Sequence, residues 1–213
     1  MSDLSKSRRT RTSGFTLIEV MIAAAVFTVF LSAAALAMQQ SMLGVACTSL
    51  EGGMDAKGSD ILELMTKELK DSGTKYSNFT IDSTGQSITF ARSIGALNNA
   101  PVFGNQIRYY AGQDPNGNTF LGRDETVNGS VQTTVMSNQL SPTAIPVTAV
   151  KGINGPGFTV NVTGINFTKT SADIVTITLV LQQTNNLLTT NVAGADNTMV
   201  IVSQGSVQLM NDL

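Results

Sequence analysis

The chain has 213 residues, of which 42% are hydrophobic and 13% charged, so it can form one folded domain with an appendage and is not disordered in composition. One cysteine and no histidine exclude a disulfide framework within the chain, imidazole catalysis and the usual zinc sites. A formal net charge of −2 does not supply the basic surface that sequence-independent nucleic-acid binding needs, so no direct nucleic-acid ligand is expected.

The N-terminal leader, residues 1–14, is basic, unlike the rest of the chain. It carries four basic residues and one acidic residue, whereas residues 15–213 carry nine basic and fourteen acidic residues. Such an asymmetry indicates that the two ends of the chain occupy different compartments.

A long apolar segment follows the leader. Nineteen residues from Val20 to Met38 carry no charge, and extending the run back to Phe15 adds Glu19 as its only ionisable group. A membrane-spanning helix needs about 20 such residues. The positive-inside rule puts the N-terminus in the cytoplasm and the C-terminal body outside. A cleaved secretory signal has a shorter apolar core than this segment, and its small-residue cleavage site follows that core. The segment is therefore not expected to be a secretory signal of that kind.

Glu19 needs an explanation because an unpaired carboxylate is costly inside a membrane. In one interpretation, the segment is a signal anchor whose Glu19 lies at the depth of the lipid headgroups. The alternative comes from the six residues Gly14-Phe15-Thr16-Leu17-Ile18-Glu19. Here a glycine and a phenylalanine follow the basic leader, and glutamate takes the fifth place after the glycine.

This sequence resembles the leader-peptidase site of type IV prepilins and type II secretion pseudopilins. The resemblance implies that prepilin peptidase, a membrane aspartic protease, cuts between Gly14 and Phe15 and that the new amino terminus of Phe15 is methylated. It also implies that Glu19 meets the N-terminal ammonium of a neighbouring subunit, and so fixes the stagger of the helices as a single buried polar residue does in a coiled coil. The expected assembly residues are Leu17, Ile18, Glu19 and Val20.

Helical periodicity continues beyond the membrane segment, over residues 39–71, and predicts an amphipathic continuation that packs on the following domain. A continuous helix from Phe15 to Asp71 would be about 85 Å long. The alternative is two helices broken at Gly52-Gly53, because glycine weakens a helix interior. Many major pilins have a proline in this helix, and its absence between Phe15 and Asp71 favours a minor pilin or a pseudopilin. Cys47 is expected on a face of the helix.

After Gly73, short β-prone runs separated by turn residues predict a β-rich head. The expected strands are Ser87–Arg92, Gln106–Tyr110, Thr119–Arg123, Ser130–Val135, Pro146–Val150, Phe158–Val162, Ile174–Gln182 and Met199–Ser203. The apolar pattern of residues 174–181 indicates a strand that the long helix covers on one face. The expected fold class is α+β, with a long N-terminal helix packed against an antiparallel sheet. Its expected parts are a leader at 1–14, a transmembrane helix at 15–38, an amphipathic helix at 39–71 and the head at 72–213.

The head shows a second resemblance, to minor pilins of the PilW type and to J-type pseudopilins. Residues 107–123, IRYYAGQDPNGNTFLGR, contain a strand that ends in tyrosine, a turn, and a leucine before an arginine. Phe167 precedes an apolar strand, as in that group. The sequence VQLMN near the C-terminus is similar to the group's Val-Leu-Arg-Asn ending, with Met210 in place of the arginine.

One segment has the spacing of a calcium loop. Asp114, Asn116, Asn118 and Glu125 take the first, third, fifth and twelfth places of an EF-hand-like loop, which supplies oxygen ligands. The sixth place, where glycine is needed, is Thr119, and Asp-Pro-Asn-Gly is ordinary turn chemistry. A structural turn is therefore expected, with calcium binding as the alternative.

No catalytic nucleophile with a neighbouring base is visible, so neither an enzyme nor a cofactor is expected. The resemblance implies a structural subunit of a type IV pilus or a type II secretion pseudopilus, held first in the inner membrane and then in the filament. Its implied partners are other pilin or pseudopilin subunits, prepilin peptidase, the inner-membrane assembly platform and membrane lipid. The alternatives are a membrane-anchored extracytoplasmic module that binds a ligand or calcium without joining a filament, and a membrane-tethered enzyme.

Overall fold

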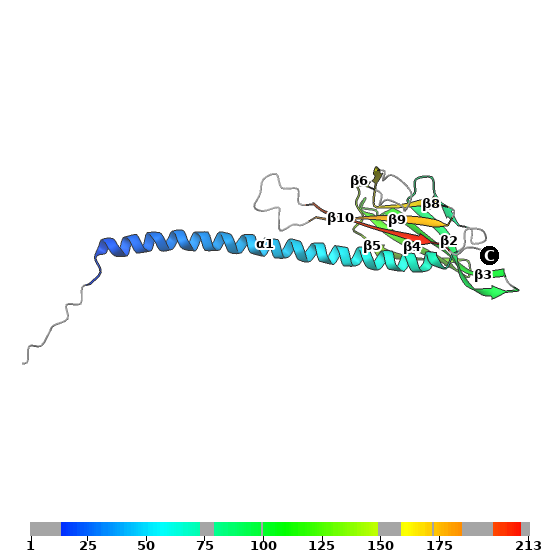
Figure 1. The fold of residues 1–213 in the computed structure, drawn as a ribbon, viewed down its shortest axis with the longest axis horizontal. Coiled ribbons are helices and arrows are strands. Elements are labelled where there is room, and N and C mark those ends of the chain that lie inside the picture. The colour runs from blue at the N-terminus through cyan, green and yellow to red at the C-terminus, as the bar shows by residue number, and fades with distance from the viewer. Residues whose placement is uncertain are drawn as a thin grey trace, which may run out of the picture. The chain divides into compact units, whose positions relative to one another are not determined.

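The structure is a computed structural model that describes residues 14–72, 79–98, 100–148, 159–171, 173–184 and 198–209. In this part of the chain one α-helix is followed by ten β-strands (Figure 1). The α+β fold class expected from the sequence is confirmed. The chain divides into two compact units, Met1–Ala46 and Cys47–Leu213.

Helix α1, Leu17–Lys70, is continuous through Gly52 and Gly53, so the alternative of two helices broken at this pair is wrong. A Cβ atom added at either glycine would meet nothing within 4 Å, so neither residue is there to allow a close contact. Each glycine weakens the helix by roughly 0.5–1 kcal/mol relative to alanine. The helix persists because the turns that follow are buried against the head.

The C-terminal end of α1 is capped by Ser72. Its backbone N–H and its hydroxyl both donate to the carbonyl oxygen of Leu69, at 2.9 and 2.7 Å. Lys67 and Lys70 lie in the last turn, where cations interact favourably with the helix dipole. The helix therefore ends at the point where the sequence changes from helical to β-prone.

The larger sheet has five antiparallel strands in the order β1-β2-β3-β4-β5. Its strands are β1 Thr80–Ile81, β2 Ser87–Leu97, β3 Ala100–Gln113, β4 Thr119–Val127 and β5 Ser130–Ser137. Consecutive strands are neighbours throughout, so the sheet is a simple meander. β5 forms one edge of it.

Two further sheets complete the head. One has three antiparallel strands in the order β10-β9-β8, formed by β8 Ile165–Ser171, β9 Ile174–Thr184 and β10 Thr198–Gln208. The other pairs β6 Ile145–Thr148 with β7 Thr159–Val162. A backbone hydrogen bond of 2.6 Å from the N–H of Phe167 to the carbonyl of Gly85 links β8 to the turn between β1 and β2.

All eight strand predictions fall on strands of the structure, with some differences in length. Six strands, β2, β3, β4, β5, β9 and β10, are longer than expected, because cross-strand pairing extends beyond the β-prone residues. The expected ends Val150 and Phe158 lie outside the described residues. The predictions omitted β1 and β8. β8 reads INFTKTS, and its polar second half does not alternate clearly.

The core of the head lies between α1 and the inner faces of the two larger sheets. The buried helix residues are Met54, Gly58, Ile61, Met65, Glu68 and Leu69, which follow helical spacing. They pack with Phe90 and Tyr109 of the large sheet and with the residues at alternate positions of β9, Val175 to Leu181. Val180 points to the other side and packs with Val162 and Ile145. β9 thus has one continuous apolar face toward the core, while its other face is covered at Val180 and carries the polar residues Thr176 and Thr178.

Candidate functional site

The residues before α1 form a reciprocal cap on its first turn. The backbone N–H of Thr16 donates to Glu19 Oε2 at 2.9 Å, and the Thr16 hydroxyl donates to the same oxygen at 3.0 Å. The N–H of Glu19 donates back to the Thr16 hydroxyl oxygen at 3.3 Å. This is the Thr-x-x-Glu capping box, which satisfies backbone donors that the helix leaves free. Gly14 and Phe15 precede the box, are not helical and are exposed.

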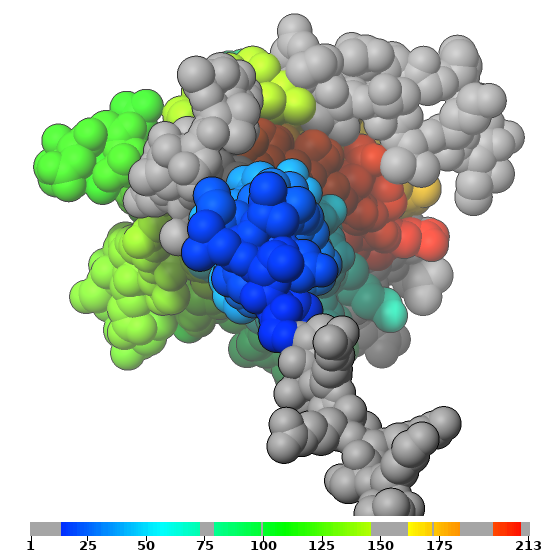
Figure 2. All heavy atoms as spheres, turned by 90° about the vertical axis from the view of Figure 1, so that its left-hand side faces the viewer, coloured from blue at the N-terminus to red at the C-terminus, as the bar shows by residue number. Residues whose placement is uncertain are grey.

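The first unit exposes an apolar surface from Phe15 to Ala46. Almost every side chain between these residues is exposed, and Figure 2 shows this segment, in blue, end-on with side chains on all sides. Glu19 shares one helix face with a row of apolar residues. They are Ile22, Ala23, Val26, Phe27 and Phe30. A surface of this kind is not stable in water and needs lipid or other helices around it.

The described chain contains one helix that is long and apolar enough to cross a membrane. This is α1, with a mean hydropathy of 2.4 over its most apolar 18 residues and none of those residues buried within the protein. Of the assembly residues expected from the sequence, Leu17, Ile18 and Val20 lie in its first turns with Glu19. The residues expected from the sequence to take part in cleavage, methylation and assembly are therefore contiguous at one end of the helix.

A second polar cluster lies inside the head, around Glu68 of α1. Arg123 of β4 forms two hydrogen bonds with it, from Nη2 to Oε1 at 2.8 Å and from Nε to Oε2 at 3.2 Å. The hydroxyl of Tyr109 on β3 donates to Glu68 Oε2 at 2.5 Å. The Glu68 and Arg123 side chains are only 7% and 16% exposed. A bidentate guanidinium and a phenol thus satisfy a carboxylate that burial would otherwise penalise.

The environment of this cluster raises the pKa values of Tyr109 and Arg123. Burial, and then the hydrogen bond to Glu68, raises the pKa of the Tyr109 phenol far above its usual value. The hydrogen bond to Glu68 raises the pKa of the Arg123 guanidinium. Tyr109 is fully buried and its ring stacks on Phe90 with 6.2 Å between ring centroids. Tyr109 and Arg123 therefore keep their protons across ordinary pH, and the cluster acts as a structural joint between helix and sheet.

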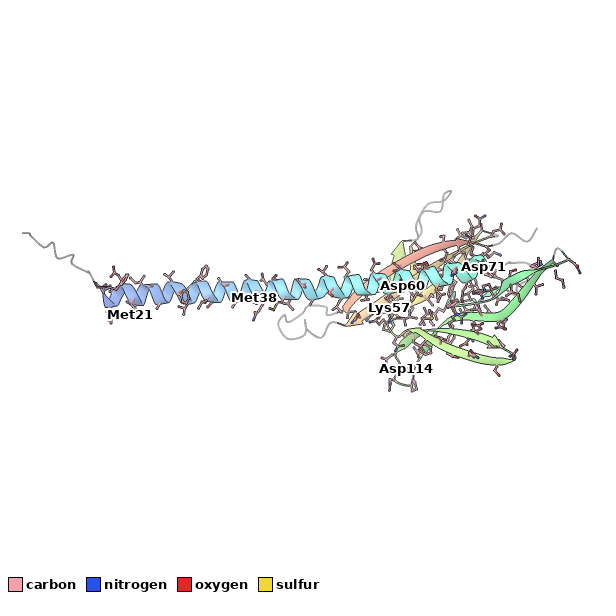
Figure 3. All side chains as sticks on the ribbon, turned by 90° about the horizontal axis from the view of Figure 1, so that it is seen from below. Met21, Met38, Lys57, Asp60, Asp71 and Asp114 are labelled. Carbon is pink, nitrogen blue, oxygen red and sulfur yellow. The ribbon has the colours of Figure 1, made fainter. Side chains whose placement is uncertain are left out.

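The calcium-loop residues do not come together as an EF-hand would require. Asp114, labelled in Figure 3, lies in the hairpin turn between β3 and β4. Its Oδ1 accepts the N–H groups of Asn116 and Asn118 at 2.9 and 2.8 Å, and its Oδ2 accepts from the Asn118 amide at 2.9 Å. The hydrogen bonds to Asn118 lower the pKa of Asp114. These contacts form the turn predicted from the sequence.

Glu125, the twelfth residue of the calcium pattern, is engaged elsewhere. It lies six residues beyond the start of β4, about 20 Å along an extended strand. It accepts from Asn105 at 3.1 Å and pairs with Arg123 at 2.9 Å. Among the described residues, no group of three His, Cys, Asp or Glu side chains is placed to hold a metal ion. Cys47 is half-buried.

The pairing of Glu68 with Arg123 was not predicted from the sequence. Arg123 was expected only as the end of a strand and as part of the resemblance of residues 107–123, and Glu68 was given no role. A signal was present, because Glu68 lies between Met65 and Leu69 on the apolar stripe of the helix. A carboxylate on such a stripe needs a buried partner. Periodicity does not show which of the distant basic residues supplies it.

Comparison with known proteins gives one match. Residues 9–35 match the family model described as the prokaryotic N-terminal methylation motif. No curated protein and no solved structure matches the chain. The matched residues contain the Gly14-Phe15 bond, the capping box and the part of α1 from Leu17 to Ala35. This match supports a place for the chain, through its N-terminal segment, among type IV pilins and pseudopilins.

Proposed function

We propose that this chain is a minor pilin or minor pseudopilin, a structural subunit of a type IV pilus or a type II secretion pseudopilus. One observation carries the proposal. The methylation motif coincides with the place where an exposed, non-helical Gly14-Phe15 bond leads directly into a capped helix whose first, apolar part is exposed. The absence of proline from α1 and the resemblance of the head to the PilW and J types favour a minor subunit.

Processing occurs, in this proposal, at the bond between Gly14 and Phe15. Proteases bind substrates in extended form, and residues 14–16 lie outside the helix. Glycine offers little steric hindrance to a protease at this position. Prepilin peptidase would remove the basic leader in the cytoplasm, and methylation would leave Phe15 with a charged secondary ammonium two residues before the helix.

Glu19 would have two successive partners. In the single chain it caps its own helix through Thr16. In the filament its carboxylate would pair with the methylated ammonium of a neighbouring subunit, because an unpaired charge among packed apolar helices is costly. The cap holds the carboxylate at the helix end where that ammonium would arrive. Leu17, Ile18 and Val20 would pack around the pair.

The membrane would act as the reservoir of subunits before assembly. The basic leader stays on the cytoplasmic side, α1 spans the inner membrane up to about Met38, and the head lies outside. Extraction from lipid into the filament exchanges lipid contacts for helix contacts. The assembly platform and other pilin or pseudopilin subunits are the partners that this step requires.

The test is the intact mass of the N-terminus of the membrane-extracted protein, for the native chain and for Gly14→Ala. We expect the native chain to begin at methylated Phe15 and the Gly14→Ala chain to keep its leader. An unprocessed native chain would contradict the proposal and favour a membrane-anchored binding module instead.

Glu19→Gln separates the two roles of Glu19. Glutamine can still close a capping box but cannot form an ion pair. We expect Glu19→Gln to be processed normally and to join filaments poorly, and Glu19→Ala to show the same assembly defect. Thr16→Val is the matched control, because it removes both hydroxyl hydrogen bonds of the capping box and keeps the carboxylate, which still accepts from the backbone N–H of residue 16. Normal assembly of Glu19→Gln would show that capping is the function of this residue and that no ionic contact between subunits is needed.

A further inference from the structure

Asparagine is followed by glycine at three places in the chain, Asn116-Gly117, Asn128-Gly129 and Asn154-Gly155. The first two lie in hairpin turns of the structure, and the third lies outside the described residues. In this dipeptide the asparagine amide is open to spontaneous loss, because glycine has no side chain to hinder attack by its own backbone nitrogen. The turn around each pair decides whether the attack takes place in the folded protein.

The turn at Asn128-Gly129 joins β4 to β5 and is held only by its flanking strands. Val127 pairs with Ser130 across it, and the φ angles of Asn128 and Gly129 are 52° and 78°, the type I′ pattern of a two-residue hairpin. Residues 128–130 and the rest of the first six residues of β5 are exposed. The left-handed conformation costs free energy for asparagine, so local opening of this edge hairpin releases strain at Asn128.

The reacting nitrogen of this turn is not held. In the described part of the chain, the backbone N–H of Gly129 has no hydrogen-bond acceptor, and no carboxylate accepts a hydrogen bond from residues 128–130. The nitrogen can therefore lose its proton to solvent without breaking a hydrogen bond. No neighbouring negative charge in direct contact with the turn opposes the anion that results.

The turn at Asn116-Gly117 is built differently, around Asp114. The N–H of Gly117 donates to the Asp114 carbonyl oxygen at 2.9 Å. The Asp114 carboxylate accepts the N–H groups of Asn116 and Asn118 at 2.9 and 2.8 Å. The nitrogen that would attack is thus hydrogen-bonded, and a carboxylate lies beside the place where negative charge would develop. These contacts protect Asn116.

We propose that Asn128 is a site of spontaneous deamidation in the folded head. The backbone nitrogen of Gly129 gives its proton to solvent and forms a bond to the side-chain carbonyl carbon of Asn128. The bond from that carbon to Nδ2 breaks, and Nδ2 leaves as ammonia, so a cyclic imide results. Water then opens the imide at either carbonyl, which gives aspartate or isoaspartate. The only co-reactant is water, and the reaction does not depend on the proposed function.

The two products have different effects on the hairpin. Both place a new carboxylate at the end of β4 and β5. Aspartate keeps the turn, because Asp-Gly also suits the type I′ conformation. Isoaspartate routes the backbone through the side-chain carbon and adds one carbon to the turn, so the pairing of Val127 with Ser130 is lost. The edge strand β5 should therefore fray from this end as the protein ages.

The test is peptide mapping by mass spectrometry after incubation of the folded full chain, in detergent, in mildly alkaline water labelled with heavy oxygen. The label marks acid groups formed during the incubation. We expect products at Asn128 to accumulate about tenfold faster than at Asn116, because the Asp114 turn must first break its hydrogen bonds. The same chain in denaturant measures the intrinsic reactivity of the two pairs, which should be similar.

Two variants test the cause of the difference. Asp114→Ala removes the carboxylate and its hydrogen bonds, so it should raise the rate at Asn116 several-fold and leave Asn128 unchanged. Asn128→Gly keeps a sequence that suits the turn but has no amide, and should remove the products at this position.

Three results would overturn the proposal. They are an intact Asn128 in the folded chain, equal rates at Asn116 and Asn128, and aspartate at position 128 without isoaspartate. The last result would indicate direct hydrolysis of the side chain without the cyclic imide.

Discussion

Glu68 and Arg123, which lie 55 residues apart in the chain, form a bidentate pair that joins α1 to β4 inside the head. Tyr109 completes the coordination of the carboxylate from β3. One side chain of the helix is thus tied to two strands. Because each polar atom of this cluster is committed to a partner, removing one member leaves another unsatisfied.

Replacing Arg123 by methionine should destabilise the head by about 3 kcal/mol, because Glu68 would stay buried without its cation. Glu68→Gln should cost less, about 1–2 kcal/mol, since the amide can still hydrogen-bond. Denaturant unfolding of the full chain in detergent measures both, and the double variant should cost less than the sum of the two. Arg108→Met, which removes an exposed guanidinium stacked 4.7 Å from the Tyr110 ring centroid, is the control and should cost less than about 1 kcal/mol. Equal losses for Arg123 and Arg108 would contradict the structural role of the pair.

The head should lose stability in alkali through Tyr109. Its pKa is raised in the folded protein by burial and by Glu68, while an unfolded tyrosine has a pKa of about 10. The folded state therefore holds a proton that the unfolded state releases, so the stabilisation is complete below pH 10 and declines as the pH rises above it. Unfolding midpoints between pH 8 and 12 should fall, and the fall should be shallower in Tyr109→Phe. Tyr110→Phe is the comparison, because burial and Asp124 also raise the pKa of this less buried phenol. Its removal should flatten the decline less than Tyr109→Phe does, and equal slopes in the two variants would exclude Tyr109 as the main cause.

Replacing glycines of α1 by alanine should change the stability of the protein in opposite directions, depending on the position. A Cβ at Gly58 would lie 2.6 Å from Ser203 Oγ and 3.5 Å from Leu181 Cδ1, so Gly58→Ala should force the helix and β10 apart and cost about 1–3 kcal/mol. Gly52→Ala and Gly53→Ala meet no atoms and should each stabilise the helix by about 0.5–1 kcal/mol. Thermal unfolding in detergent would compare the three. A destabilising Gly52→Ala would indicate a contact at that face with another molecule.

Calcium should not stabilise the head through the Asp114 turn. Both carboxylate oxygens of Asp114 already accept hydrogen bonds from Asn116 or Asn118. The Glu125 carboxylate accepts a hydrogen bond from Asn105 and forms an ion pair with Arg123. We expect the Tm of the full chain to be the same in millimolar Ca²⁺ and in chelator. A rise in Tm with calcium that Asp114→Asn abolishes would establish the EF-hand-like alternative. Asp114→Ala should lower the Tm without calcium, because the turn loses its three side-chain hydrogen bonds.

The Gly14–Glu19 segment, α1 and most strands were predictable from residues near one another in sequence. Charge, apolar length and the spacing of Glu19 after Gly14 are all local, and helical or alternating periodicity reports burial on one face. The residues near Gly52-Gly53 did not decide whether the helix breaks there, because local propensity carries no information on the packing that follows at Met54 and Gly58. The strand β8 was missed because its pairing with β9, and not its own pattern, makes it a strand.

The character of the N-terminal segment follows from its residues alone, because its signals are composition and spacing along one continuous helix. The folded structure was needed to identify the partner of Glu68, the engagement of Glu125 away from the Asp114 turn, and the extension of the β2 and β3 hairpin beyond its sheet. Each of these depends on which distant segments come into contact. Such contacts are set by the packing of helix and sheets as a whole, which no local pattern of residues records.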